Sequence, residues 1–209
     1  MKKIKKILIV ILLIISFFIF YFGFNQCIYY YSYFNNNPRV VYVDTYFVIN
    51  DDIQDPQLQN SINYINEELE KSIDKFYEET EIQIYFKQLN IINNNSWHTI
   101  EVSDFGNKQP EEVIDEFYTG KPVLVFVLNL DDDATMGVTS WDRNGALLRY
   151  NCSHITILHE LGHIFSLNHY WFKFNLMYPH EEFIKLNLTP FQIGKLKRKI
   201  EISNWHHLR

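Results

Sequence analysis

The spacing of hydrophobic residues predicts that strands and helices alternate along the chain. Apolar residues recur every three or four positions in residues 56–79, which predicts an amphipathic helix with Glu and Lys on its outer face. Residues 39–50 are rich in β-branched and aromatic side chains, and apolar and polar residues alternate over 82–87, so both segments are predicted strands. Residues 122–128 form a continuous apolar run, typical of a strand buried on both faces. This order predicts an α/β fold with a mostly parallel sheet covered by helices.

The second half of the chain predicts shorter elements. Residues 110–118 favour a short helix, and residues 134–141 and 146–150 favour two strands around an Asn-Gly turn. Ser153 is a suitable N-cap for a helix that carries the most distinctive motif of the chain. A last helix is predicted to start with a capping box at Thr189-Pro190-Phe191-Gln192 and to end near residue 202.

The N-terminus is predicted to enter a membrane. Four lysines within residues 1–6 precede an apolar run from Ile7 to Phe24 that only Ser16 and Gly23 interrupt. Its 18 residues reach the lower limit for a spanning helix and exceed the usual core of a cleaved signal peptide. The lysines should stay in the cytoplasm, which places the rest of the chain on the extracytoplasmic side.

The domain boundaries follow from this reading. Residues 1–24 are the predicted anchor, 25–38 a linker with an aromatic patch, and 39–209 one compact domain. The alternatives are a cleaved signal sequence, which would release the protein, or a lipid on Cys27. Two free thiols, at Cys27 and Cys152, are favoured over a bridge between them.

Composition excludes one class of partner. The formal net charge is −6 and the 19 basic residues are scattered, so the chain lacks the basic stripe that binds nucleic acid. No pattern in the sequence indicates the oligomeric state of the protein. Asp131-Asp132-Asp133 offers carboxylates to a calcium ion, but consecutive residues do not by themselves converge on one ion, so a solvated acidic turn is favoured.

The most informative stretch runs from His159 to His169. His159 and His163 are four residues apart, so on a helix their imidazoles point to a common position. Glu160 is rotated by about 100° from His159, where it can act as a general base without binding the metal itself. His169 can join the two histidines only if the helix ends and the chain bends back. Three imidazoles with one open position are typical of a catalytic zinc site.

These residues resemble the signature of the metzincin zinc endopeptidases, H-E-x-x-H-x-x-G-x-x-H followed by a methionine turn. The sequence Asn175-Leu176-Met177-Tyr178-Pro179 resembles the methionine turn of the matrixin branch. Ser166 replaces the family glycine, so the bend must occur at Ser166 or be shared as far as Asn168.

The resemblance implies a zinc-dependent endopeptidase with an antiparallel edge strand along its cleft and with Met177 beneath the histidines. It implies that His159, His163 and His169 hold zinc and that Glu160 moves the proton. An unpaired edge strand could bind a peptide or protein substrate by strand addition. The alternatives are an idle domain that binds peptides or a partner, and a zinc hydrolase of non-peptide amides. The aromatic residues 170–174 either shape the pocket or complete the core.

Overall fold

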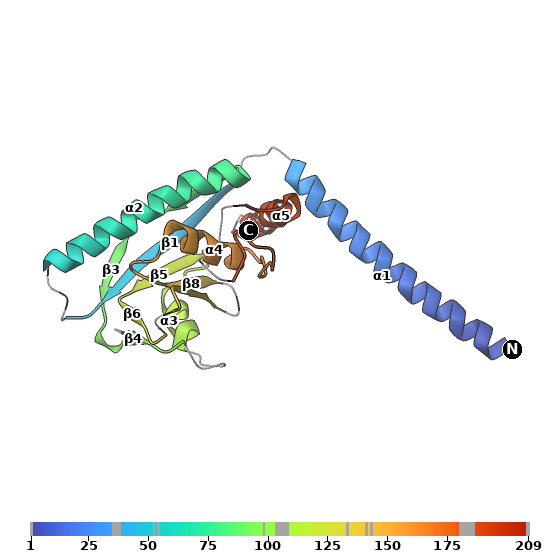
Figure 1. Ribbon diagram of the computed structural model, residues 1–209, viewed down its shortest axis with the longest axis horizontal. Helices are drawn as coiled ribbons and strands as arrows, with labels where there is room; N and C mark the ends of the chain where they lie inside the picture. The colour runs from blue at the N-terminus through green and yellow to red at the C-terminus, as the bar shows by residue number, and fades with distance from the viewer. Residues whose placement is uncertain are drawn as a thin grey trace.

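The structure is a computed structural model that describes residues 2–34, 39–51, 53, 55–97, 99–102, 109–132, 134–140, 142, 144–179 and 187–207. A twisted sheet forms the centre of the domain (Figure 1), with strand order β2-β1-β5-β8-β7 and β3 also paired with β1. The strands are β1 (Arg39–Ile49), β2 (Ile82–Phe86), β3 (Asn90–Asn93), β5 (Val123–Val127), β7 (Gly137–Thr139) and β8 (Gly145–Arg149). The pairs within β1, β2, β3, β5 and β8 are parallel, whereas β7 runs antiparallel to β8. The predicted α/β class with an antiparallel edge strand is therefore confirmed.

Helices cover the two faces of the sheet separately. The long helix α2 (Asp55–Thr80) and helix α4 (His154–Ile164) pack on one face, and the short α3 (Gln109–Phe117) packs on the other. Side chains of the central strand β5 divide between them, with Leu124 and Phe126 toward α2 and α4 and its three valines toward α3. This division explains why the β5 sequence is apolar at every position.

The edge strand β7 lies beside α4. Its three residues pair with Leu148, Leu147 and Ala146 of β8, so the two strands predicted around the Asn-Gly turn are both present. Gly145, however, lies inside β8 instead of at the tip of a tight turn, and the amide of Ser140 donates to its carbonyl at 3.0 Å. The connection between the two strands is therefore longer than the tight turn that the Asn-Gly pair predicted.

Three short strands have no clear signal in the sequence. After β2 ends, β3 pairs with the second half of β1, so that these two strands share one edge of β1 in succession. A separate two-stranded sheet joins β4 (Thr99–Ile100) to β6 (Asn129–Leu130). A single-turn helix, η1 (Asn95–Trp97), connects β3 and β4.

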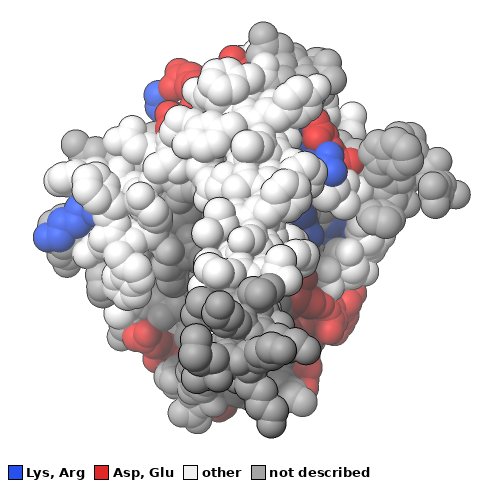
Figure 2. Space-filling model, turned by 90° about the vertical axis from the view of Figure 1, so that its right-hand side faces the viewer, with Lys and Arg blue, Asp and Glu red and all other residues white. Residues whose placement is uncertain are grey.

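Helix α1 (Lys2–Phe34) projects away from the domain (Figure 1). Its part from Ile11 to Phe34 is long and apolar enough to cross a membrane, and an 18-residue window within this part has a mean hydropathy of 2.1 and no buried residue. Seen from the side toward which α1 projects, the described surface is mostly uncharged, with charged side chains scattered toward its edges (Figure 2).

Residues 25–34 were predicted as part of a linker, but in the structure they continue helix α1. The reason is packing against the last helix, α5 (Pro190–His207). The Tyr29 ring meets Phe191 edge to face at a centroid distance of 5.0 Å, and the Lys197 ammonium donates to the carbonyl of Tyr33 at 3.2 Å. These contacts stabilise a helical conformation that the local sequence does not require.

Cys27 is exposed and Cys152 is buried in the core, and the two form no disulfide, which agrees with the two thiols predicted.

Candidate active site

Helix α4 carries the predicted motif, and its first turn is fixed by two capping side chains. The hydroxyl of Ser153 accepts from the amide of Thr156 at 3.3 Å, as predicted for an N-cap. Glu68 of α2 accepts from the amide of His154 at 2.6 Å. Burial tends to raise the pKa of Glu68, but hydrogen bonds from Lys71 and His154 outweigh it and hold that pKa below its usual value. An ionised carboxylate at a helix N-terminus is favourable, so α2 positions α4.

The helix ends in the bend that the third histidine requires. Ser166 has φ 73°, the left-handed conformation that glycine usually adopts at this position. The amide of Ser166 donates to the carbonyl of His163, and the amide of Leu167 donates to that of Gly162, both at 2.8 Å. This pair of hydrogen bonds is a Schellman motif. Ser166 alone carries the turn, at a cost of about 1–2 kcal/mol relative to glycine.

The bend brings the three imidazoles together. His163 Nε2 lies 3.1 Å from His159 Nε2 and 3.1 Å from His169 Nε2. Among the residues that the structure describes, these three histidines are the one group of at least three His, Cys, Asp or Glu placed to hold a metal ion. Tetrahedral zinc with Zn–N bonds of about 2.0–2.1 Å separates two ligand nitrogens by about 3.3 Å, so the observed spacing fits that ion.

Backbone carbonyls set the orientation of two of the rings. His159 Nδ1 lies 2.7 Å from the carbonyl oxygen of Leu176, and His163 Nδ1 lies 2.9 Å from that of Leu167. A carbonyl can only accept, so each Nδ1 carries the proton and each neutral ring presents a lone pair on Nε2. Two facing lone pairs repel each other unless a cation lies between them, so the donor set fits a metal ion.

The electrostatic surroundings also favour the neutral form of His163. Burial lowers the pKa of His163, and this effect outweighs the nearby Glu160 carboxylate, which raises it. A neutral imidazole is the form that binds a metal.

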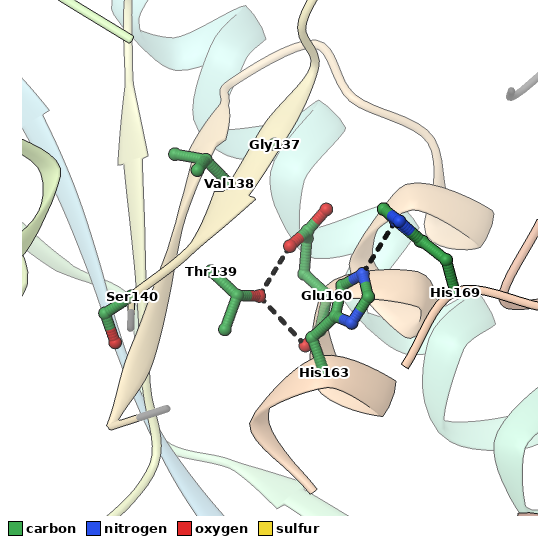
Figure 3. A pocket seen from close by; sticks show the side chains of 7 residues that line it. All are labelled: Gly137, Val138, Thr139, Ser140, Glu160, His163 and His169. Carbon is green, nitrogen blue, oxygen red and sulfur yellow. Dashed lines mark hydrogen bonds between the residues drawn. The ribbon is translucent and has the colours of Figure 1, made fainter. Parts of the chain in front are cut away.

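Glu160 is held against the edge strand rather than among the histidines. The hydroxyl of Thr139 on β7 donates to Glu160 Oε2 at 2.5 Å (Figure 3). A Cβ on Gly137 would lie 2.9 Å from Glu160 Cγ, so only a glycine leaves room for this side chain. Thr139 and Gly137 were not identified from the sequence, although a glycine inside a strand is a signal of close approach.

A hollow of about 340 Å³ opens between the edge strand and the motif. Its lining is formed by Gly137, Val138, Thr139, Ser140, Glu160, His163 and His169 (Figure 3). The carboxylate of Glu160 and the ring of His163 therefore face the same space beside β7. An extended chain laid along β7 would pass both groups.

The segment after His169 returns beneath α4. A Cβ on Gly162 would lie 2.5 Å from Met177 Sδ, so Met177 packs directly against the helix backbone, where it is fully buried. Asn175 and Gln192 exchange two amide hydrogen bonds at 2.9 and 3.1 Å. Gln192 also completes the predicted capping box with Thr189, which ties this turn to the start of α5.

Two other predicted features lie outside this site. Asp131 and Asp132 bind loop groups, the amide of Val102 at 2.6 Å and the hydroxyl of Thr135 at 2.5 Å, which agrees with the acidic turn and gives no support to calcium. Asp133 lies outside the described residues. The aromatic residues 170–174 are not among the residues that line the hollow, and their rings are exposed rather than part of the core.

Comparison with known proteins gives the following results. No model of a known protein family matches the sequence, and no curated protein matches it. Metalloproteinase-II from Bacteroides fragilis matches the structure with 16% identity and a TM-score of 0.47, covering 78% of this chain and 53% of that chain. A mutant of Tannerella forsythia promirolysin matches with 13% identity and a TM-score of 0.48, covering 83% and 87%. This chain spans about half the length of the Bacteroides enzyme.

Proposed function

We propose that this protein is a zinc-dependent endopeptidase of the metzincin type, close to the matrixin branch in its methionine turn. The observation that carries the proposal is the convergence of three Nε2 atoms within one metal site, 3.1 Å apart for each pair that includes His163. His159, His163 and His169 hold the zinc in this proposal. Glu160 faces the same hollow and has no place among the three ligands.

Zinc bound there would supply a Lewis acid that lowers the pKa of water and polarises a substrate carbonyl. The chain supplies the remaining steps. Strand β7 holds an extended peptide by strand addition, which places its scissile bond beside Glu160. Glu160 then takes the proton from the attacking water and delivers it to the leaving amine. Thr139 orients the carboxylate for both transfers.

The experiment that tests this function uses the full chain in detergent with a mixed peptide library. Products are identified by mass spectrometry with and without a chelator. We expect internal cleavage that stops when the metal is removed and returns when zinc is added. Intact peptides with zinc present would refute the function, while retained peptide binding would favour the idle domain. Cleavage only of non-peptide amides would favour the other hydrolase.

Thr139 gives a sharper prediction about the site. Thr139→Val removes the hydroxyl but keeps the branched shape, so Glu160 loses its 2.5 Å partner while β7 keeps its packing. A hydrogen bond to a charged group contributes about 1.5–3 kcal/mol, so we expect kcat to fall by about 10- to 150-fold with little change in KM. Thr139→Ser should restore the rate. Equal rates in Thr139→Val and the wild type, at equal zinc content, would remove Thr139 from this role.

We also propose that α1 anchors the protein with the domain on the extracytoplasmic side. Protease added to intact cells should then digest the domain and leave a cytoplasmic control protein intact. Immunoblotting with an antibody to the C-terminal helix measures the result. Protection of the domain would reverse the proposed orientation, and a mature N-terminus near residue 25 would identify α1 as a cleaved signal.

A further inference from the structure

Four exposed aromatic rings follow the third histidine. Tyr170, Trp171, Phe172 and Phe174, here called the aromatic loop, are exposed to 42%, 78%, 70% and 49%. Phe174 has φ 70°, a left-handed conformation that is unfavourable for a residue with a Cβ. The loop thus has an unfavourable backbone conformation at Phe174 while its rings stay exposed to solvent. Large exposed aromatic side chains grouped in one loop mark an interaction surface.

Hydrogen bonds fix the aromatic loop to helix α5. Asn175, directly after the loop, exchanges two amide hydrogen bonds with Gln192, and the amide of Leu176 donates to the carbonyl of Asn187 at 3.0 Å. Asn175 and Gln192 are both buried, so these bonds are protected from water. The loop and the first turn of α5 thus form one unit.

Helix α5 is in turn fixed to the end of α1. A Cβ on Gly194 would lie only 1.9 Å from the carbonyl oxygen of Tyr29, so the two helix backbones are in direct contact. The buried Lys197 adds a hydrogen bond to the carbonyl of Tyr33. Through α5, the aromatic loop has a defined position relative to the apolar helix.

That position is close to the end of the apolar run. Phe24 ends the run and Tyr29 contacts α5, so five residues, or about 7.5 Å of helix, separate the end of the run from this contact. The headgroup layer on each side of a bilayer is of similar thickness, about 5–8 Å. If the apolar run of α1 spans the hydrocarbon core, the contact between α1 and α5 lies at the level of the headgroups.

The chemistry of the aromatic loop suits the same layer. The described part of the segment between α4 and α5 lies on the side of the domain toward which α1 projects (Figure 1). Tyrosine and tryptophan rings are enriched at the boundary between hydrocarbon and water.

We propose that the aromatic loop inserts into the headgroup layer of the membrane that α1 enters, as a second membrane contact. His169 directly precedes the loop, so this contact holds the three-histidine site beside the lipid surface. The peptides reached from there are segments close to the membrane. The lipid contact rests on the proposed insertion of α1 and does not depend on the proposed hydrolysis.

The test uses the full chain reconstituted in phosphatidylcholine nanodiscs, with and without lipids that carry a nitroxide near the headgroup. Nitroxide quenches tryptophan fluorescence at short range, so the wild type should be quenched and Trp171→Phe should lose most of that quenching. Trp97→Phe is the matched control, because Trp97 packs against Phe117 on the α3 side of the sheet. The Trp97→Phe variant should keep the lipid-dependent quenching. Equal quenching in Trp171→Phe and the wild type would overturn the proposal.

Two further measurements separate this proposal from the others. Flotation with liposomes in sodium carbonate tests the insertion of α1, and its failure would overturn the anchor and the lipid contact together. Cleavage of one peptide, either free or tethered to lipid, tests the role of the contact. The double variant Trp171→Ser, Phe172→Ser should cut the tethered peptide several-fold more slowly and the free peptide at the wild-type rate. An equal loss on both peptides would contradict the lipid contact, and no cleavage by the wild type would refute the hydrolase alone.

Discussion

Replacement of His163 by alanine is expected to remove most of the zinc from the purified protein. His163 is the central ligand of the proposed set, because its Nε2 lies 3.1 Å from the Nε2 of both other histidines. Loss of a residue that only supports a ligand typically weakens metal binding by about 10- to 100-fold, so loss of a ligand should exceed about 100-fold. Two imidazoles make a poor tetrahedral site. Metal analysis by mass spectrometry after dialysis measures the zinc per chain.

The matched control is His154→Ala on the same helix. His154 begins α4 and contacts Glu68, so its removal also perturbs the helix start while the metal ligands stay intact. We expect one zinc per chain in the wild type and in this control. Equal zinc in His163→Ala and His154→Ala would exclude the three-histidine site. Circular dichroism of both variants separates metal loss from unfolding.

The grouping of the three histidines was predictable because they lie within eleven residues of sequence. The i, i+4 spacing of His159 and His163 is a local property of a helix, and the structure places their Nε2 atoms together. The sequence did not determine at which residue from Ser166 to Asn168 the bend occurs. The structure resolves this choice at Ser166, because the Schellman hydrogen bonds require the left-handed residue directly after Phe165.

The partners of the site were not predictable, because they come from distant parts of the chain. Thr139 is 21 residues before Glu160 in sequence and reaches it only because the edge strand packs beside α4. Glu68 caps α4 from 86 residues away. Neither residue belongs to a motif, and a polar residue on a predicted strand or helix is usually solvated.

The same reason explains why residues 25–34 are helical. Their polar and aromatic composition suggested a linker, but Lys197 meets Tyr33 across 164 residues of sequence and stabilises the helix. The strand β3 was missed because it has only four residues, two of them asparagines, which are rare in strands. In both cases, contacts with distant parts of the chain determine the secondary structure.

The largest effect on catalysis is expected from Glu160→Gln. Glutamine keeps the size of the side chain and can accept the hydrogen bond from Thr139, but it cannot take a proton from water. Zinc should stay bound, since Glu160 is not one of the three grouped histidines. General-base catalysis contributes about 10²- to 10⁴-fold, so peptide cleavage should fall by that factor. The measurement is kcat at matched zinc content.

Glu116→Gln is the control for this change, because Glu116 is an exposed glutamate on α3, a helix of the opposite sheet face. It should cut peptides at the wild-type rate. The comparison also separates the enzyme from an idle binding domain, which would bind peptide equally well in all three proteins and cut it in none. If Glu160→Gln kept wild-type turnover with zinc bound, the proton would have to move through another group. The role of Glu160 as general base would then be wrong, even with the three histidines still holding the metal.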